Sequence, residues 1–166
     1  MTDPSNICLS CGLCCNGTLI GFVHLDGDEL SSVSEFMEIV KEGNQGFFLQ
    51  PCDKLGPGGC SIYSNRPKQC AKFNCGLLNA VEQKEIDFNA AVDVIKRVRQ
   101  LKRTIEKTLL NLTFNLKSKS FYFQTLELKK LLRKMENQSP LSHHHQKLNA
   151  ELCQLDEILL NKFGLT

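Results

Sequence analysis

The sequence predicts an α+β fold, in which a small cysteine-rich region with short strands (residues 1–80) precedes an antiparallel helical region (residues 81–166) packed on it. Two observations support this prediction. Eight of the nine cysteines lie between Cys8 and Cys75, among short apolar runs and glycine-rich turns. Beyond Cys75, apolar residues recur at helical spacing over long stretches.

The first elements expected in the cysteine-rich region are a strand and a helix. Residues 17–25 (GTLIGFVHL) are rich in β-branched and aromatic side chains and predict a strand or one arm of a hairpin. Residues 25–43 predict a helix, with Asp26 as its N-cap, Glu29 completing a capping box and Gly43 ending it. The expected buried face of this helix comprises Leu30, Val33, Phe36, Met37 and Val40.

The rest of this region should alternate between extended chain and turns. Residues 46–52 predict a short strand that delivers Cys52. Residues 54–60 (KLGPGGC) have the composition of a tight turn. The following residues, 60–70, should lead from extended chain into a short helix that Asn65 caps.

Three helices are expected in the second half of the chain. A break at 83–87 precedes a long helix with Asp87 as its N-cap, and residues 121–136 predict a second. In the third, at 141–163, leucines and His145 are spaced four and three residues apart alternately. Because this heptad seam is apolar, the helix should pair with another helix, either in the same chain or in a second copy or protein partner.

Charge and hydropathy restrict the setting of the protein. Residues 1–75 carry five basic and eight acidic side chains, whereas residues 76–166 carry fifteen and ten. No apolar run approaches the length of about 20 residues that spans a bilayer, and the N-terminal residues show no pattern of a secretory signal. We therefore expect a cytoplasmic protein without a membrane segment, whose cysteines bind metal or are redox-active rather than forming disulfides.

The cysteine pattern predicts metal ligation. Thiolates bind soft or borderline metals, and a C-x-x-C-x-x-C run with a distant fourth cysteine is how ferredoxin-type loops hold an iron–sulfur cluster. Gly12, within the run, supplies the backbone freedom that such a loop needs. The candidate ligands are Cys8, Cys11, Cys14, Cys15, Cys52, Cys60, Cys70 and Cys75.

The adjacent pair Cys14–Cys15 bears on the number of sites. Neighbouring side chains in extended chain point to opposite sides, so one mononuclear site could use both only with a distorted backbone. The simplest arrangements are two four-thiolate sites, or one site with additional nearby thiols.

These motifs resemble the CxxCxxCC, or YkgJ-like, family of zinc- or iron-chelating proteins. The resemblance rests on CLSCGLCC at 8–15, the Cys52 and Cys60 pair, IYxxRPxxC at 62–70 and FxC at 73–75, and covers about residues 8–110. It implies cysteine-held metal but no defined biochemical role. A flagellin lysine methylase shares the cysteine motif in a longer chain, but no S-adenosylmethionine loop is evident here, so that activity is not carried over.

Two functions follow from the pattern. The first is an iron–sulfur protein, with a 4Fe–4S cluster favoured, in a redox or metal-handling role. The second is a structural zinc module that mediates protein interaction through the C-terminal helices. The sequence does not decide whether the protein is an enzyme, since it shows no nucleotide-binding loop or Ser/His/Asp set.

A few other side chains bear on the site. Arg66 could donate hydrogen bonds to cluster sulfurs or fix its loop, and Tyr63 precedes it in the same motif. His24 could replace one thiolate, although a packed or exposed strand histidine is expected, and Cys153 should be a packed thiol. The basic face around Arg99 should be solvated or turned toward the acidic half, and nucleic-acid binding is not expected.

Overall fold

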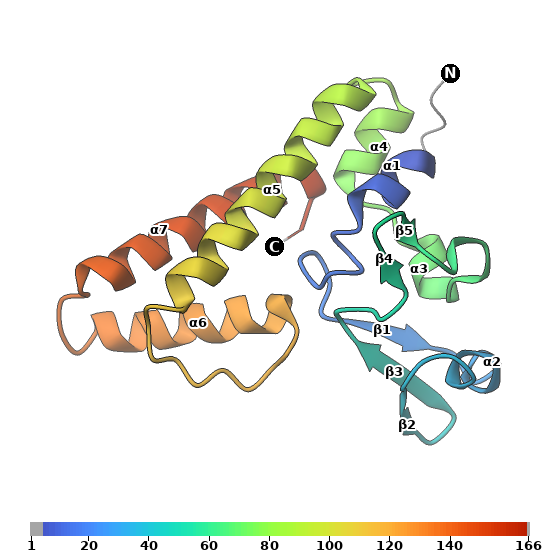
Figure 1. Cartoon of the computed structure of the whole chain (residues 1–166), viewed down its shortest axis with the longest axis horizontal. Helices are drawn as coiled ribbons and strands as arrows, with labels where there is room; N and C mark the ends of the chain where they lie inside the picture. Colours follow the sequence, from blue (N-terminus) through green and yellow to red (C-terminus); the bar gives the residue numbers. More distant parts are fainter. Residues whose placement is uncertain (1–4, 166) are drawn as a thin grey trace.

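The computed structural model describes residues 5–165, and the predicted α+β class is confirmed. In Figure 1 the three long helices lie on one side of the molecule, and the strands and short helices lie on the other. Residues 1–4, on which part of the expectation about export rests, lie outside the described residues. Within the described range, no helix combines the length and apolarity that crossing a membrane requires.

The first half of the chain consists of short elements. They are α1 (Ser5–Cys11), β1 (Phe22–Leu25), α2 (Leu30–Ser34), β2 (Val40–Glu42), β3 (Gln45–Leu49), β4 (Leu55–Gly56), β5 (Gly59–Cys60), the 3-10 turn η1 (Tyr63–Asn65) and α3 (Lys68–Lys72). β1, β3 and β2 form an antiparallel sheet in that order, and β4 and β5 form a separate hairpin. The sheet buries Val23, Leu25 and Phe48 against Val33 and Met37.

The prediction of a helix over residues 25–43 is wrong in its length. α2 covers only Leu30–Ser34, its N-cap is Glu29 rather than Asp26, and Val40 is 51% exposed. One half of the capping box does form, since the backbone N–H of Asp26 donates to the Glu29 carboxylate at 3.2 Å. Residues 40–42 pair with β3 instead, and Gly43, at φ +59°, forms the hairpin turn. The non-local strand pairing therefore overrides the local helical spacing.

The short helix after η1 begins later than predicted. Asn65 ends η1 and does not cap a helix, whereas Pro67 occupies the N-cap of α3. Proline fits there because it lacks an N–H and its backbone is extended.

The second half is helical, as predicted. Its elements are α4 (Gly76–Glu82), α5 (Phe88–Leu109), α6 (Phe121–Glu136), α7 (His143–Ile158) and the π-helical turn η2 (Leu159–Phe163). The predicted cap of α5 is confirmed, because the Asp87 carboxylate accepts a hydrogen bond from the Ala90 N–H at 2.9 Å. The seam of α7 packs on α5 within the same chain, through Leu148, Leu152 and Leu155.

The helical core also includes residues from the N-terminal segment. Ile7, Leu13 and Leu77 join the buried cluster of α5, α6 and α7. The Arg99 guanidinium on α5 donates to the carbonyl oxygens of Ser10 at 2.6 Å and Cys11 at 2.9 Å. The end of α1 is therefore fixed to the long helix. The division of the chain at residue 80 stays a prediction.

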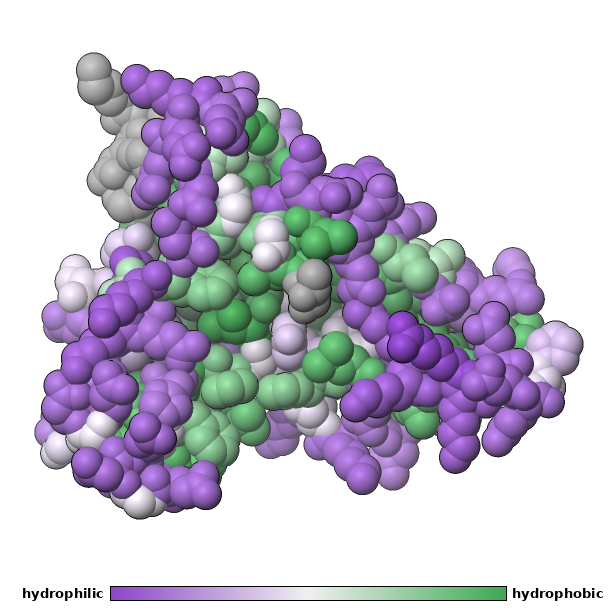
Figure 2. All heavy atoms as spheres, turned by 180° about the vertical axis from the view of Figure 1, so that it is seen from behind, coloured by the Kyte–Doolittle hydropathy of each residue, from purple (hydrophilic) through white to green (hydrophobic). Residues whose placement is uncertain are grey.

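Figure 2 shows the rear face, where apolar surface gathers in a band between the hydrophilic surfaces of the two sides. Cys153, expected to be packed, is exposed on α7, because the seam turns toward α5 and leaves its position outside.

The α5–α7 seam provides a stability prediction. Leu148 is fully buried, so Leu148→Ala should lower the free energy of unfolding by about 2–5 kcal/mol, through lost burial and a residual cavity. Urea denaturation measures the change. Leu110→Ala is the control, because Leu110 is 86% exposed and its truncation should cost less than about 0.5 kcal/mol. Equal losses in both variants would contradict the packed seam.

Candidate metal centre

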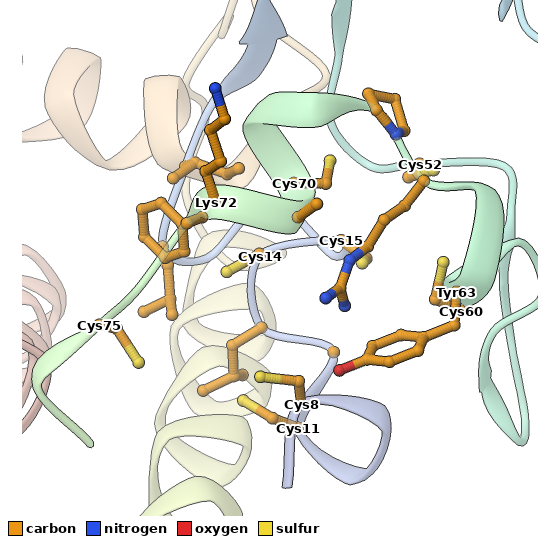
Figure 3. Close-up of a pocket in the computed structure, with 18 of the residues that line it drawn as sticks. Cys8, Cys11, Cys14, Cys15, Cys52, Cys60, Tyr63, Cys70, Lys72 and Cys75 are labelled. Carbon is orange, nitrogen blue, oxygen red and sulfur yellow. The ribbon is translucent and has the colours of Figure 1, made fainter. Parts of the chain in front are cut away.

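All eight predicted cysteines line one cavity of about 430 Å³. They reach it from separate elements, as Figure 3 shows. Cys8 and Cys11 lie on α1, Cys14 and Cys15 on the loop after it, Cys52 after β3, Cys60 on β5, Cys70 on α3 and Cys75 directly before α4. The structure thus brings together every cysteine of the predicted constellation.

The loop between α1 and β1 is held tightly. Gly12, at φ +56°, reverses the chain after α1, in a conformation that favours glycine. Leu13 is fully buried, and its carbonyl accepts hydrogen bonds from the backbone N–H groups of Thr18 and Leu19. The Cys52 N–H donates to the Cys15 carbonyl at 2.7 Å, which ties the end of β3 to this loop.

The β4–β5 hairpin approaches α1 closely. A Cβ atom at Gly59 would collide with the Leu9 carbonyl oxygen, and Gly59 also has a positive φ of +97°. Only glycine satisfies both conditions without strain, and its presence allows Cys60 to reach the cavity.

The cysteines divide into two groups of four. For the Cys14 thiol, burial raises the pKa most, followed by the neighbouring Cys11 and Cys75. For the Cys15 thiol, burial raises the pKa to about 11, and the next neighbours are Cys52 and Cys60. We call Cys8, Cys11, Cys14 and Cys75 the α1 group. We call Cys15, Cys52, Cys60 and Cys70 the hairpin group.

Packing agrees with this division. All four cysteines of the α1 group contact the helical core that contains Leu13. Cys52 and Cys70 of the hairpin group contact the smaller core of the sheet and α2. The packing of these six cysteines on two different cores is the pattern expected for two four-thiol groups, and the number of metal sites stays a prediction.

Burial sets the protonation of these thiols. It raises the pKa of Cys11 to about 12 and that of Cys70 to about 12. Burial also raises the pKa values of Cys8, Cys14 and Cys52. Without a cation these thiols are neutral at physiological pH, because an isolated buried thiolate is poorly solvated.

The spacing of the sulfurs bears on the kind of centre. In the described part of the chain, no three cysteine sulfurs lie mutually within 4.8 Å. Zinc held by four thiolates at about 2.3 Å places its sulfurs about 3.8 Å apart. The thiols, as placed, therefore surround spaces wider than one mononuclear zinc ion needs.

Tyr63 and Arg66 also line the cavity. The Arg66 guanidinium carbon lies 3.9 Å from the centroid of the Tyr63 ring, which is a cation–π stack. Arg66 opposes the effect of burial on the pKa of Cys8 and of Cys70. Arg66 lines the same cavity as the thiols of both groups.

His24 does not join the cysteines. It lies on β1, outside the residues that line the cavity, and its Nδ1 is 4.0 Å from an Asp26 carboxylate oxygen. Asp26, Asp28 and Glu29 form an acidic cluster away from the cavity, but Lys68 lies among them, 2.6 Å from Asp28. This cluster anchors α3 to α2.

Sequence reasoning missed other residues of the cavity wall. Gln50, Lys72 and Glu82 line it, and Glu82 faces Cys8. Their positions depend on tertiary packing, and no motif marks them. The basic face of the long helix was expected to be solvated or turned toward the acidic half of the chain. Arg99 does turn toward that half, since it donates hydrogen bonds to the carbonyl oxygens of Ser10 and Cys11.

Comparison with known families identifies the cysteine-rich part of the chain. Residues 7–97 match the model of the CxxCxxCC family, whose description is "Putative zinc- or iron-chelating domain". The chain belongs to this family. The CxxCxxCC match ends at residue 97, earlier than the expected boundary near 110, and includes all eight cavity cysteines. Family membership indicates metal chelation and does not distinguish zinc from iron. Comparisons with curated proteins and with solved structures produced no match.

Separate replacement of the adjacent cysteines tests the division into groups. Cys14→Ser and Cys15→Ser should each lose the metal of one group and retain the other, because their thiols have different neighbours. Metal analysis and native mass spectrometry measure the content. Cys153→Ser, at an exposed position, is the control and should lose none. Complete loss of metal from both variants would indicate one shared site.

Metal loading should release protons. Metals bind thiolates, whereas burial keeps these thiols protonated, so each group should release up to about four protons on loading. Affinity should therefore increase as the pH rises toward the raised pKa values of Cys11, Cys15 and Cys70. Calorimetric titration of the apo protein with zinc, in two buffers of different ionisation enthalpy, measures the release. Heats that do not depend on the buffer would contradict it.

Proposed function

We propose that this protein holds two iron–sulfur centres, one in each cysteine group, and serves a redox or metal-handling role. The observation that carries the proposal is the convergence of eight cysteines, in two groups of four, on one cavity. Four thiolates are a complete ligand set for one 4Fe–4S cluster. When bound, each cluster supplies a site that accepts and releases one electron.

The α1 group fits a cluster best. Cys8, Cys11 and Cys14 form the C-x-x-C-x-x-C run, and Cys75 is the distant fourth cysteine. This is the ligand pattern of ferredoxin-type loops, in which each thiolate binds a different iron.

The hairpin group would draw its ligands from four separate segments. The Lys54 N–H lies 3.4 Å from the Cys52 sulfur, and such donors stabilise thiolate ligands and tune the metal they hold. Arg66 would add a positive charge near an anionic centre. These residues of the chain would bind and orient the centre and limit its access to water.

The second candidate is a structural zinc module that binds a protein partner or a second copy through its C-terminal helices. It is favoured by the family description, which names zinc beside iron. The leucine seam of α7 already packs on α5, so a partner at the 141–163 segment would use the outer face of the helix.

We also propose a cytoplasmic location. All nine cysteines are free thiols, which a reducing compartment would preserve.

Anaerobic purification decides between the two candidates. We expect a brown protein with broad visible absorption that dithionite bleaches, containing about eight iron atoms and about eight sulfides per chain. The reason is that each four-thiol group completes one cube. Colourless protein with bound zinc would support the second candidate. A folded, metal-free protein that cannot be reconstituted would contradict both.

A further inference from the structure

The two cysteine groups are separated by very little chain. Cys14 of the α1 group packs on the helical core, whereas the carbonyl of Cys15, in the hairpin group, accepts from the Cys52 N–H, so one peptide bond joins a ligand of one group to a ligand of the other. Both groups open into the same cavity. Centres bound in both groups would therefore be close neighbours.

Neighbouring thiolate centres repel one another. A centre with four thiolates has a net negative charge, and charges in a partly buried site are weakly screened. Glu82 also lines the cavity and adds a carboxylate to its wall. Simultaneous loading of both groups is therefore favoured by a positive charge between them.

Arg66 occupies such a position. Its guanidinium stacks on the Tyr63 ring at 3.9 Å, so it is held in place rather than free in solvent. In Figure 3 the Tyr63 ring extends from the side of Cys60, in the hairpin group, toward Cys8 in the α1 group. Arg66 thus lies over a side chain that runs between the two groups.

Arg66 shares its cavity with thiols of both groups. Cys8 of the α1 group and Cys70 of the hairpin group line the same wall as Arg66, and Arg66 directly precedes the proline at the N-cap of α3, on which Cys70 lies. Lys72 lines the same cavity, but Figure 3 shows its side-chain nitrogen directed away from the cysteine sulfurs. The two cations are therefore placed differently with respect to the thiols.

We propose that Arg66, held by Tyr63, couples the two cysteine groups: one cation offsets the mutual repulsion of two anionic centres, so that both can be filled and reduced together. This inference rests on the proposed function of the cysteine groups. Arg66 is a positioning residue in this scheme and need not bind the metal.

The test compares loading of wild-type protein and Arg66→Gln. Anaerobic reconstitution with increasing iron(II) and sulfide, followed by native mass spectrometry, measures chains with no, one and two centres. In Arg66→Gln the second centre should bind about tenfold more weakly, so that singly loaded chains accumulate. At saturating iron and sulfide, both reduction potentials should become more negative, because each added electron loses a stabilising cation.

Matched variants separate charge from structure. Lys72→Gln removes the same unit charge from the same cavity wall, and its loading and potentials should stay close to wild type. Arg66→Lys keeps the charge but loses the flat guanidinium, so it should recover most of the second-centre loading. Tyr63→Leu removes the stacking partner and should fall between wild type and Arg66→Gln.

Two results would overturn the coupling. The first is that Arg66→Gln and Lys72→Gln show the same second-centre loading and the same two reduction potentials. The second is that Arg66→Lys loads the second centre as poorly as Arg66→Gln does, because charge would then be irrelevant. Circular dichroism shows whether Arg66→Gln folds. If it does not, the second-centre loading and the potentials of Arg66→Lys and Tyr63→Leu are compared with those of wild type and Lys72→Gln instead. Wild-type protein that binds no iron contradicts the proposed function instead, and titration with zinc alone then tests the coupling by the same measurement.

Discussion

The structure of the cysteine region depends on the opposed directions of two adjacent side chains. Leu13 is fully buried in the helical core and anchors the loop, so Cys14 and Cys15 have little freedom to turn. Both cysteines lie in a turn closed by the Asn16 N–H to Gly12 carbonyl hydrogen bond, and Figure 3 shows the Cys14 sulfur directed toward the side of Cys75 and the Cys15 sulfur toward the side of Cys60. The other segments are arranged around these two directions.

The two groups also connect two hydrophobic cores. The α1 group contacts the large core of the long helices, and Cys52 and Cys70 contact the small core of the sheet and α2. The core of the sheet and α2 contains five buried hydrophobic side chains, fewer than the helical core, so apolar burial contributes less to the stability of that part. Metal bound in the cavity would cross-link these segments and contribute folding free energy where packing is sparse. Family membership indicates metal chelation.

The fold was predictable where local signals and tertiary packing agree. α5 and α6 were located from their apolar spacing, and the cap at Asp87 forms as expected. The helix predicted over 25–43 failed because Val40–Glu42 pairs with β3, an interaction that local spacing does not encode. The heptad seam of α7 predicted a helical partner, but only the structure showed that this partner is α5 in the same chain.

For the site, the sequence by itself determined the ligand type, since eight cysteines in this spacing indicate metal and the motifs indicate the family. It predicted that Cys14 and Cys15 point apart if the chain is extended there, whereas the structure places both in a turn. Only the tertiary structure decided that Cys75 joins the C-x-x-C-x-x-C run while Cys52, Cys60 and Cys70 join Cys15. It likewise placed Arg66 near both groups. The physical reason is that these contacts join segments far apart along the chain, whose approach depends on packing of the cores and on close contacts such as Gly59 against Leu9.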